Sequence, residues 1–120
     1  MKKIIILLAL AGLVGCAPRI QTVDLIQGAE SVKVYRKSDP PSSCVEIRPF
    51  TAVNGEGCGR MGTMGGFEPA YNTFKNMVVE LGGNAGLIVK EVPNHPEPRC
   101  YVNAYTIDGV AYKCPPDAMK

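Results

Sequence analysis

Four cysteines in the body of this 120-residue chain restrict its possible folds more than any other feature. Cys44 and Cys58 are 14 residues apart, and so are Cys100 and Cys114. Opposed residues in two antiparallel segments have a constant sum of residue numbers, and the pairs 44/114 and 58/100 share the sum 158. Of the three connectivities that four cysteines allow, we predict Cys44–Cys114 and Cys58–Cys100. A bulge between the two pairs would break this simple register.

The start of the chain has the pattern of a secretion signal. Lys2 and Lys3 precede an apolar run at residues 4–14. A membrane-spanning helix needs ~20 apolar residues, so this run is too short to span and suits a signal peptide. An N-terminal membrane anchor and a buried helix are the alternatives. We predict that residues 1–15 are removed on export, which would place the four body cysteines in an oxidising compartment.

The residues that follow the apolar run match a bacterial lipobox, Leu13-Val14-Gly15-Cys16. In such a box the cysteine thiol is alkylated by diacylglycerol, and cleavage exposes its amine to acylation. Two or three acyl chains anchor a protein firmly, whereas one binds marginally. We therefore predict lipid attachment at Cys16. Because Ala17 and not Asp follows, the enteric sorting rule predicts the outer membrane, with the domain in the periplasm.

Loss of the predicted signal peptide changes the charge of the chain. The full sequence has 13 Lys+Arg and 11 Asp+Glu, and Lys2 and Lys3 belong to the leader. The remaining 105 residues are then balanced, with 11 basic and 11 acidic side chains. This length allows one small domain, and the balance provides no basic field for nucleic acid.

Hydrophobic periodicity predicts one helix and four strands. Residues 69–81 carry an apolar helical stripe, and Gly82-Gly83 suits the C-terminal cap of that helix. The stripe consists of Ala70, Phe74, Met77, Val78 and Leu81. The predicted strands are residues 31–36, 44–53, 86–92 and 101–114. Pro49 places the second strand at an edge or a bulge.

The last predicted strand has two alternatives. Asp108-Gly109 is either a hairpin turn or a bulge within one long strand, which the disulfide register favours. The remaining segments are a glycine-rich loop at residues 54–66 and a proline-rich loop at residues 93–98. The order ββαββ predicts an α+β two-layer sandwich, with one helix packed on a small, mostly antiparallel sheet.

No set of residues in the sequence indicates a reaction or a cofactor. Gly57-Cys58-Gly59-Arg60-Met61-Gly62 fits G-x-G-x-x-G, but the chain is too short for a dinucleotide-binding fold. His95 stands alone in the proline-rich loop, and neither C-x-x-C nor G-x-S-x-G occurs. Since the carboxylates are also scattered, we predict a non-enzymatic protein without cofactor, nucleotide or metal.

Several segments together resemble small bacterial outer-membrane lipoproteins related to the RcsF envelope-stress lipoprotein. They are the lipobox, the strand at 31–36, the glycine-rich loop, Leu81-Gly82-Gly83-Asn84-Ala85 and Gly109-Val110-Ala111-Tyr112-Lys113-Cys114. The resemblance covers residues 31–115. It implies that Cys58 and Cys100 join the loop before the helix to the loop after the third strand, with Cys44 and Cys114 as the second pair.

The resemblance also implies a division of the chain and a function. Residues 1–15 would be the signal peptide, 16–30 a lipidated tether, 31–115 an RcsF-like domain and 116–120 a tail. The tether lacks the long proline-rich linker of that family, and at ~3.3 Å per residue it reaches only ~45–50 Å. The implied function is binding of an outer-membrane or periplasmic protein, or stress sensing. A structural lipoprotein without signalling, and a small hydrolase or ligand binder, are the alternatives.

Overall fold

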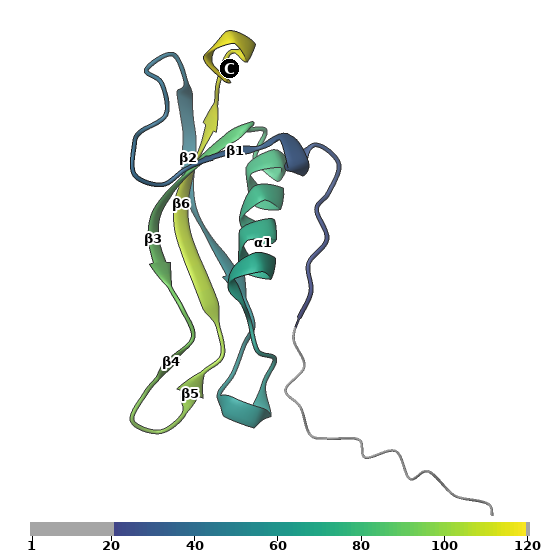
Figure 1. Ribbon diagram of the computed structural model, residues 1–120, viewed down its shortest axis with the longest axis vertical. Helices are drawn as coiled ribbons and strands as arrows, with labels where there is room; N and C mark the ends of the chain where they lie inside the picture. Colours follow the sequence, from purple (N-terminus) through teal and green to yellow (C-terminus); the bar gives the residue numbers. More distant parts are fainter. Residues whose placement is uncertain (1–20, 120) are drawn as a thin grey trace, which may run out of the picture.

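The computed structural model describes residues 21–119, so the predicted signal peptide and Cys16 lie outside the described residues. One helix, α1 (Phe67–Glu80), packs on one face of a four-stranded sheet (Figure 1). The sheet order is β1-β3-β6-β2, formed by β1 (Lys33–Tyr35), β3 (Ala85–Val92), β6 (Tyr105–Lys113) and β2 (Val45–Asn54). The predicted α+β class, with a helix on a small sheet, is confirmed.

Short elements complete the structure. They are β4 (His95–Pro96), β5 (Tyr101–Val102) and the 3-10 turns η1 (Ala29–Ser31), η2 (Gly59–Met61) and η3 (Pro116–Met119). The sequence analysis missed the β4–β5 sheet, because two-residue strands have no periodicity to detect. Two sheet pairings are antiparallel, and β1 pairs with β3 in parallel, so the sheet is mixed.

Helix α1 confirms the predicted apolar stripe and the predicted cap. Phe74 and Val78 are fully buried against the sheet, and Met77 packs at the margin of the same core. After the helix, Gly82 has a φ of +85°, and the amides of Gly82 and Gly83 bond back to the last turn, as in a Schellman cap. The cap turns the chain directly into β3.

Strand β6 runs without a turn through Gly109, as the disulfide register favoured. The predicted strand at 101–114 is nevertheless interrupted at residues 103–104, and Tyr101–Val102 form β5. A side chain at position 109 would enter the core, since a Cβ on Gly109 would lie 2.3 Å from Cε2 of Phe74. Gly86 on β3 faces the same ring, where a Cβ would lie 2.6 Å from Cε1. The two glycines therefore let the ring of Phe74 rest on the sheet, 4.8 Å from the ring centroid of Phe50.

Both predicted disulfides, Cys44–Cys114 and Cys58–Cys100, are present. The single register used to predict them is wrong in detail. The β2–β6 pairing shifts by one residue between Glu46 and Arg48, and Cys58 forms its backbone bridge with Val102. Cys58 and Cys100 thus bond across a loop region beyond the sheet, rather than as opposed residues in one ladder. Pro49 lies on β2, an edge strand, as predicted.

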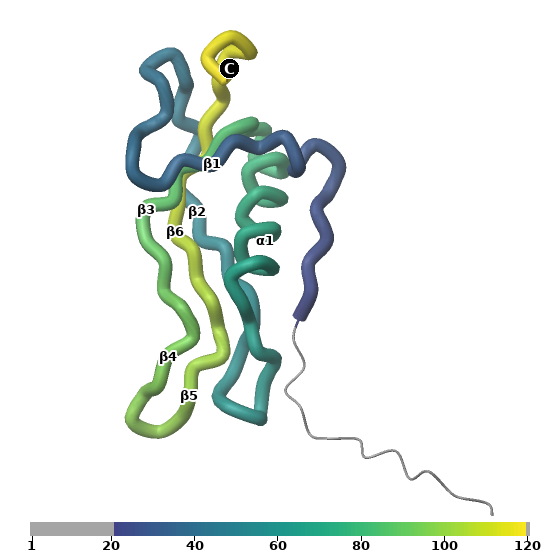
Figure 2. The backbone as a smooth tube through the Cα atoms, in the orientation of Figure 1, coloured from purple at the N-terminus to yellow at the C-terminus, as the bar shows by residue number. Residues whose placement is uncertain are grey.

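The second half of the predicted tether packs against the helix. Residues 21–31 run beside α1, and η1 contacts it (Figure 2). The side chain of Asn76 accepts a hydrogen bond from the amide of Ile26 and donates one to the carbonyl of Asp24. Asn72 donates to the carbonyl of Val23. Where the sequence predicted a free segment as far as residue 30, the structure shows a docked one, because polar helix side chains satisfy its backbone.

Candidate interaction surface

Within residues 21–119, no helix covers the sheet face that points away from α1, although the connection between β1 and β2 runs on that side at one end (Figure 1). Successive strand residues alternate between faces, and Phe50, Ala52 and Ile107 belong to the core under α1. Their neighbours therefore lie on the opposite, outer face. Three cross-strand rows cross it: Pro49–Val110–Leu87, Thr51–Asp108–Lys90 and Val53–Thr106–Val92.

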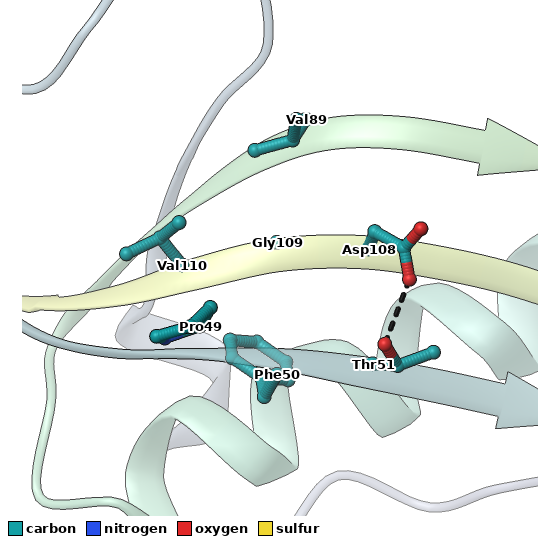
Figure 3. A pocket seen from close by; sticks show the side chains of 7 residues that line it. All are labelled: Pro49, Phe50, Thr51, Val89, Asp108, Gly109 and Val110. Carbon is teal, nitrogen blue, oxygen red and sulfur yellow. Dashed lines mark hydrogen bonds between the residues drawn. The ribbon is translucent and has the colours of Figure 1, made fainter.

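A shallow groove of about 450 Å³ lies on this outer face (Figure 3). Its lining comes from the three neighbouring strands and consists of Pro49, Phe50, Thr51, Val89, Asp108, Gly109 and Val110. The register of β3 shifts between Ile88 and Lys90, which leaves Val89 without a partner on β6 at this point. The bulge therefore raises the Val89 side chain at one side of the groove, opposite Pro49.

The chemistry of the groove is mainly apolar. Its two polar side chains satisfy each other, because the Thr51 hydroxyl donates a hydrogen bond of 2.7 Å to Oδ1 of Asp108. The remaining lining side chains are hydrocarbon rings or aliphatic groups. Burial of these apolar atoms under a partner would be favourable, and the one polar pair could fix the orientation of that partner.

Three aliphatic side chains on β2 and β3 are more than half exposed. Val45 is 66% exposed, Val53 51% and Val89 65%. Val89 lines the groove, and Val53 lies on the same outer face, two residues beyond Thr51 on β2. Val45 lies at the start of β2, outside the groove. Val53 and Val89 therefore add exposed aliphatic surface to the outer face.

Strand β2 also leaves one edge of the sheet open. It pairs only with β6 and runs for ten residues. An open edge of this length presents unpaired backbone donors and acceptors, to which an extended partner segment can add as a strand. Pro49 removes one backbone donor, and the bulge after Glu46 twists the edge, so both features limit uncontrolled pairing.

The sequence carries a signal for this surface in the apolar residues of two strands. The predicted second and fourth strands carry apolar residues at both odd and even positions, such as Val53 beside Ala52 and Val110 beside Ala111. A strand that has one face on the core and the other in solvent alternates apolar with polar residues. Apolar residues at both parities place apolar side chains on both faces of the strand, and one of those faces packs under α1.

The loop region at the end of the molecule far from η3 is held by a disulfide and by hydrogen bonds to one buried side chain. The Cys58–Cys100 disulfide joins η2 to the β4–β5 connection. The fully buried Asn103 donates its side-chain amide to the carbonyls of Glu56 and Gly59, and its own carbonyl accepts from the amide of Gly65. The predicted glycine-rich loop is therefore ordered around one asparagine.

His95 lies at this end, on β4, with an exposed side chain. Its Nδ1 is 2.9 Å from the carbonyl oxygen of Pro93 and its Nε2 is 2.9 Å from Oε1 of Glu97. Both partners favour the protonated ring, so the Pro93 carbonyl first and the Glu97 carboxylate second raise the pKa of His95 above 6.5. Both contacts of the ring therefore lie within the proline-rich loop at residues 93–98.

A polar cluster at the start of α1 links β3 and β6 to the segment after β1. The Tyr105 hydroxyl donates a 2.8 Å hydrogen bond to Oε2 of Glu91, whose other oxygen pairs with Arg36. Burial and then the bond to Glu91 raise the pKa of Tyr105 above 10. The Arg36 guanidinium also lies over the rings of Phe67 and Tyr71, at 5.2 and 5.7 Å. This cluster stabilises the fold, since each charge has a partner.

The structure places the cysteines predicted as site residues apart from the groove. Cys44 and Cys114 join the start of β2 to the end of β6, whereas Cys58 and Cys100 join the loops at the other end. Among residues 21–119, no three His, Cys, Asp or Glu side chains gather as metal ligands would. No helix in the described part of the chain has the length and apolar character needed to cross a bilayer.

Comparison of the chain with protein-family models, with curated proteins and with solved structures found no match.

Proposed function

We propose that this chain is an exported, lipid-anchored protein of the bacterial envelope that binds another envelope protein and catalyses no reaction. The observation that carries the binding role is the outer sheet face, where Pro49, Val89 and Val110 line an apolar groove. The lining lacks histidine, cysteine and lysine, and its one polar pair is internally satisfied. This chemistry supports burial of a partner surface better than acid–base or nucleophilic catalysis.

The export and anchoring parts of the proposal rest on the sequence. Residues 1–15 would be the signal peptide, and Cys16 would carry the acyl chains in the outer membrane, with the domain in the periplasm. The two disulfides support passage into an oxidising compartment, because such bonds persist there and are rare in the cytosol. The resemblance to RcsF-like lipoproteins adds envelope-stress sensing as the form that the interaction takes.

Site-specific photocrosslinking in intact cells tests the binding role. A photoreactive amino acid replaces Val89 in the groove, and a matched variant carries it at Glu80, an exposed position on the opposite layer. We expect a discrete crosslinked protein from position 89 and none from position 80. A second variant, Val53→Lys, places a charge on the outer face and should abolish that adduct. Absence of an adduct at 89, or equal adducts at both positions, contradicts the assignment of this face.

Metabolic labelling tests the anchor independently. Cells that express the full chain should incorporate labelled palmitate into it, and Cys16→Ala should abolish both the label and the shift in mass. Recovery of an unlabelled protein that fractionates with the periplasmic contents would contradict the anchor while leaving the interaction surface open to the crosslinking test.

A further inference from the structure

The docked N-terminal segment fixes where the chain emerges from the domain. The segment runs along α1 from η1 toward the helix start, and the amide of Gln21 lies 3.4 Å from the carbonyl of Met64. Met64 belongs to the connection between η2 and α1. The described chain therefore begins beside the connection that leads into α1, in the half of the molecule that carries η2, β4 and β5 and away from η3 (Figure 2).

The distance to the predicted lipid is short. Five residue steps separate Gln21 from Cys16. At ~3.3–3.6 Å per residue, these steps span at most ~18 Å when fully extended. A free tether from Cys16 to residue 30 would allow almost three times that distance. Docking of residues 21–31 on α1 thus confines one end of the domain to the neighbourhood of the bilayer surface.

The side chains at that end suit a bilayer interface. Met61 on η2 is 92% exposed, and Tyr101 on β5 is 43% exposed. Beside them in the chain, Arg60 and Arg99 are exposed as well. Tyrosine is enriched at membrane–water interfaces, and arginine can extend its charge to the headgroups while its stem lies along apolar surface. The carboxylates Glu56 and Glu97 lie in the same loops, so the end has no strong net charge.

The η2 loop and the β4–β5 connection are also cross-linked to each other. Cys58 directly precedes η2 and Cys100 directly precedes β5, so their disulfide fixes Met61 and Tyr101 at the same end. The bridge from Cys58 to Val102 and the buried Asn103 hold the same two loops together. A rigid surface loses little conformational entropy on binding, which favours contact by a few exposed side chains.

We propose that the η2 and β4–β5 end of the domain rests on the bilayer that holds the acylated Cys16, with Met61 and Tyr101 in the headgroup region. This inference rests on the lipid anchor of the proposed function. The contact is apolar in character, because the basic and acidic side chains at this end offset each other. The domain would then stand upright on the membrane, with Val45 and η3 farthest from the lipid and the outer face of the sheet accessible from the side.

The absence of tryptophan from the sequence provides a clean test. The full chain with Met61→Trp is purified from membranes in its acylated form and placed in phosphatidylethanolamine–phosphatidylglycerol vesicles that contain a brominated phosphatidylcholine. We expect the tryptophan emission to shift to shorter wavelength and to lose most of its intensity. Val45→Trp, an exposed position at the opposite end of the sheet, is the matched control and should retain its emission.

Each outcome has a defined meaning. Equal emission from the two variants, in protein that floats with the vesicles, overturns the inference while the anchor stands. Protein that does not float, and whose mass shows no acyl chains, contradicts the proposed anchor itself. If Met61→Trp fails to form both disulfides, Tyr101→Trp is the second reporter and carries the same expectation. Replacing phosphatidylglycerol with neutral lipid should leave the quenching unchanged, and loss of quenching would overturn the apolar character of the contact.

Discussion

The ring of Phe74 occupies the space that a side chain on Gly109 would need. A Cβ at position 109 would lie 2.3 Å from Cε2 of Phe74 and 2.6 Å from the carbonyl oxygen of Leu87. Helix α1 and the central strand β6 are therefore fitted to each other at this point. The close approach also fixes the helix over the middle of one face of the sheet.

Gly109→Ala should destabilise the domain by overpacking. A methyl group cannot enter without moving the buried Phe74 ring or the backbone of β3, and such insertions typically cost about 1–3 kcal/mol. Chemical denaturation of the oxidised protein measures the free energy of unfolding. Gly66→Ala is the control, because its Cβ would meet only Pro69 atoms at 3.6 and 3.7 Å, and it should change stability much less. Equal losses for the two variants would contradict the fit between ring and strand.

Asn76→Ala should release the N-terminal segment from α1. The variant removes two hydrogen bonds, to the amide of Ile26 and the carbonyl of Asp24, each worth about 1 kcal/mol net. Hydrogen exchange should show loss of protection at the Ile26 amide, while the sheet amides stay protected. Thr73→Ala is the control on the same helix, since its hydroxyl donates to the carbonyl of Pro69 within α1. Unchanged protection of Ile26 in Asn76→Ala would show that other contacts hold the segment.

The two disulfides should stabilise different parts of the molecule. The bonds span sequence separations of 70 and 42 residues, so the chain-entropy model assigns about 4 kcal/mol to each. Replacing Cys58 and Cys100 by alanine should loosen the loop end first, with faster exchange at Val102. The matched double variant at Cys44 and Cys114 should leave Val102 protected. Equal exchange at Val102 in both variants would contradict this division.

The pKa of His95 should exceed 6.5 in the folded protein. The Pro93 carbonyl and the Glu97 carboxylate both favour the protonated ring. A raised folded pKa adds stability that is fully present below the unfolded value of 6.5 and is lost as the pH rises through the folded value. An NMR titration of this single histidine measures the pKa. Glu97→Gln should lower it only in part, since the backbone carbonyl is the larger cause, and a wild-type value at or below 6.5 would contradict the geometry.

Local patterns predicted the elements that short-range chemistry controls. The stripe around Phe74 and the glycines at 82 and 83 specify where α1 faces and where it ends, because both depend on neighbouring residues. Pro49 indicated an edge strand for an equally local reason, since proline lacks a backbone donor. The parallel pairing of β1 with β3 was not predictable in this way, because it joins residues about 50 positions apart.

The two predicted disulfides show how a correct pairing can follow from an incomplete register. Equal spacing of the cysteines suggested one continuous ladder, but a bulge after Glu46 shifts the pairing of β2 with β6. The pairing survives because Cys44 and Cys114 bond at the near end of the ladder, whereas Cys58 and Cys100 bond between loops, where side chains have more freedom. Spacing therefore constrained which cysteines meet, but not how their backbones meet.

The sequence by itself determined one helix on a small sheet and the partners of four cysteines, and it predicts a leader that ends in a lipobox. Those properties depend on local periodicity, on spacing and on the chemistry of single residues. Only the tertiary structure decided that the outer sheet face carries an apolar groove and that residues 21–31 dock on α1. Both depend on contacts between distant segments. The amide of Asn76 meets the backbone of Ile26, and the bulge at Val89 faces Pro49, only after the chain has packed.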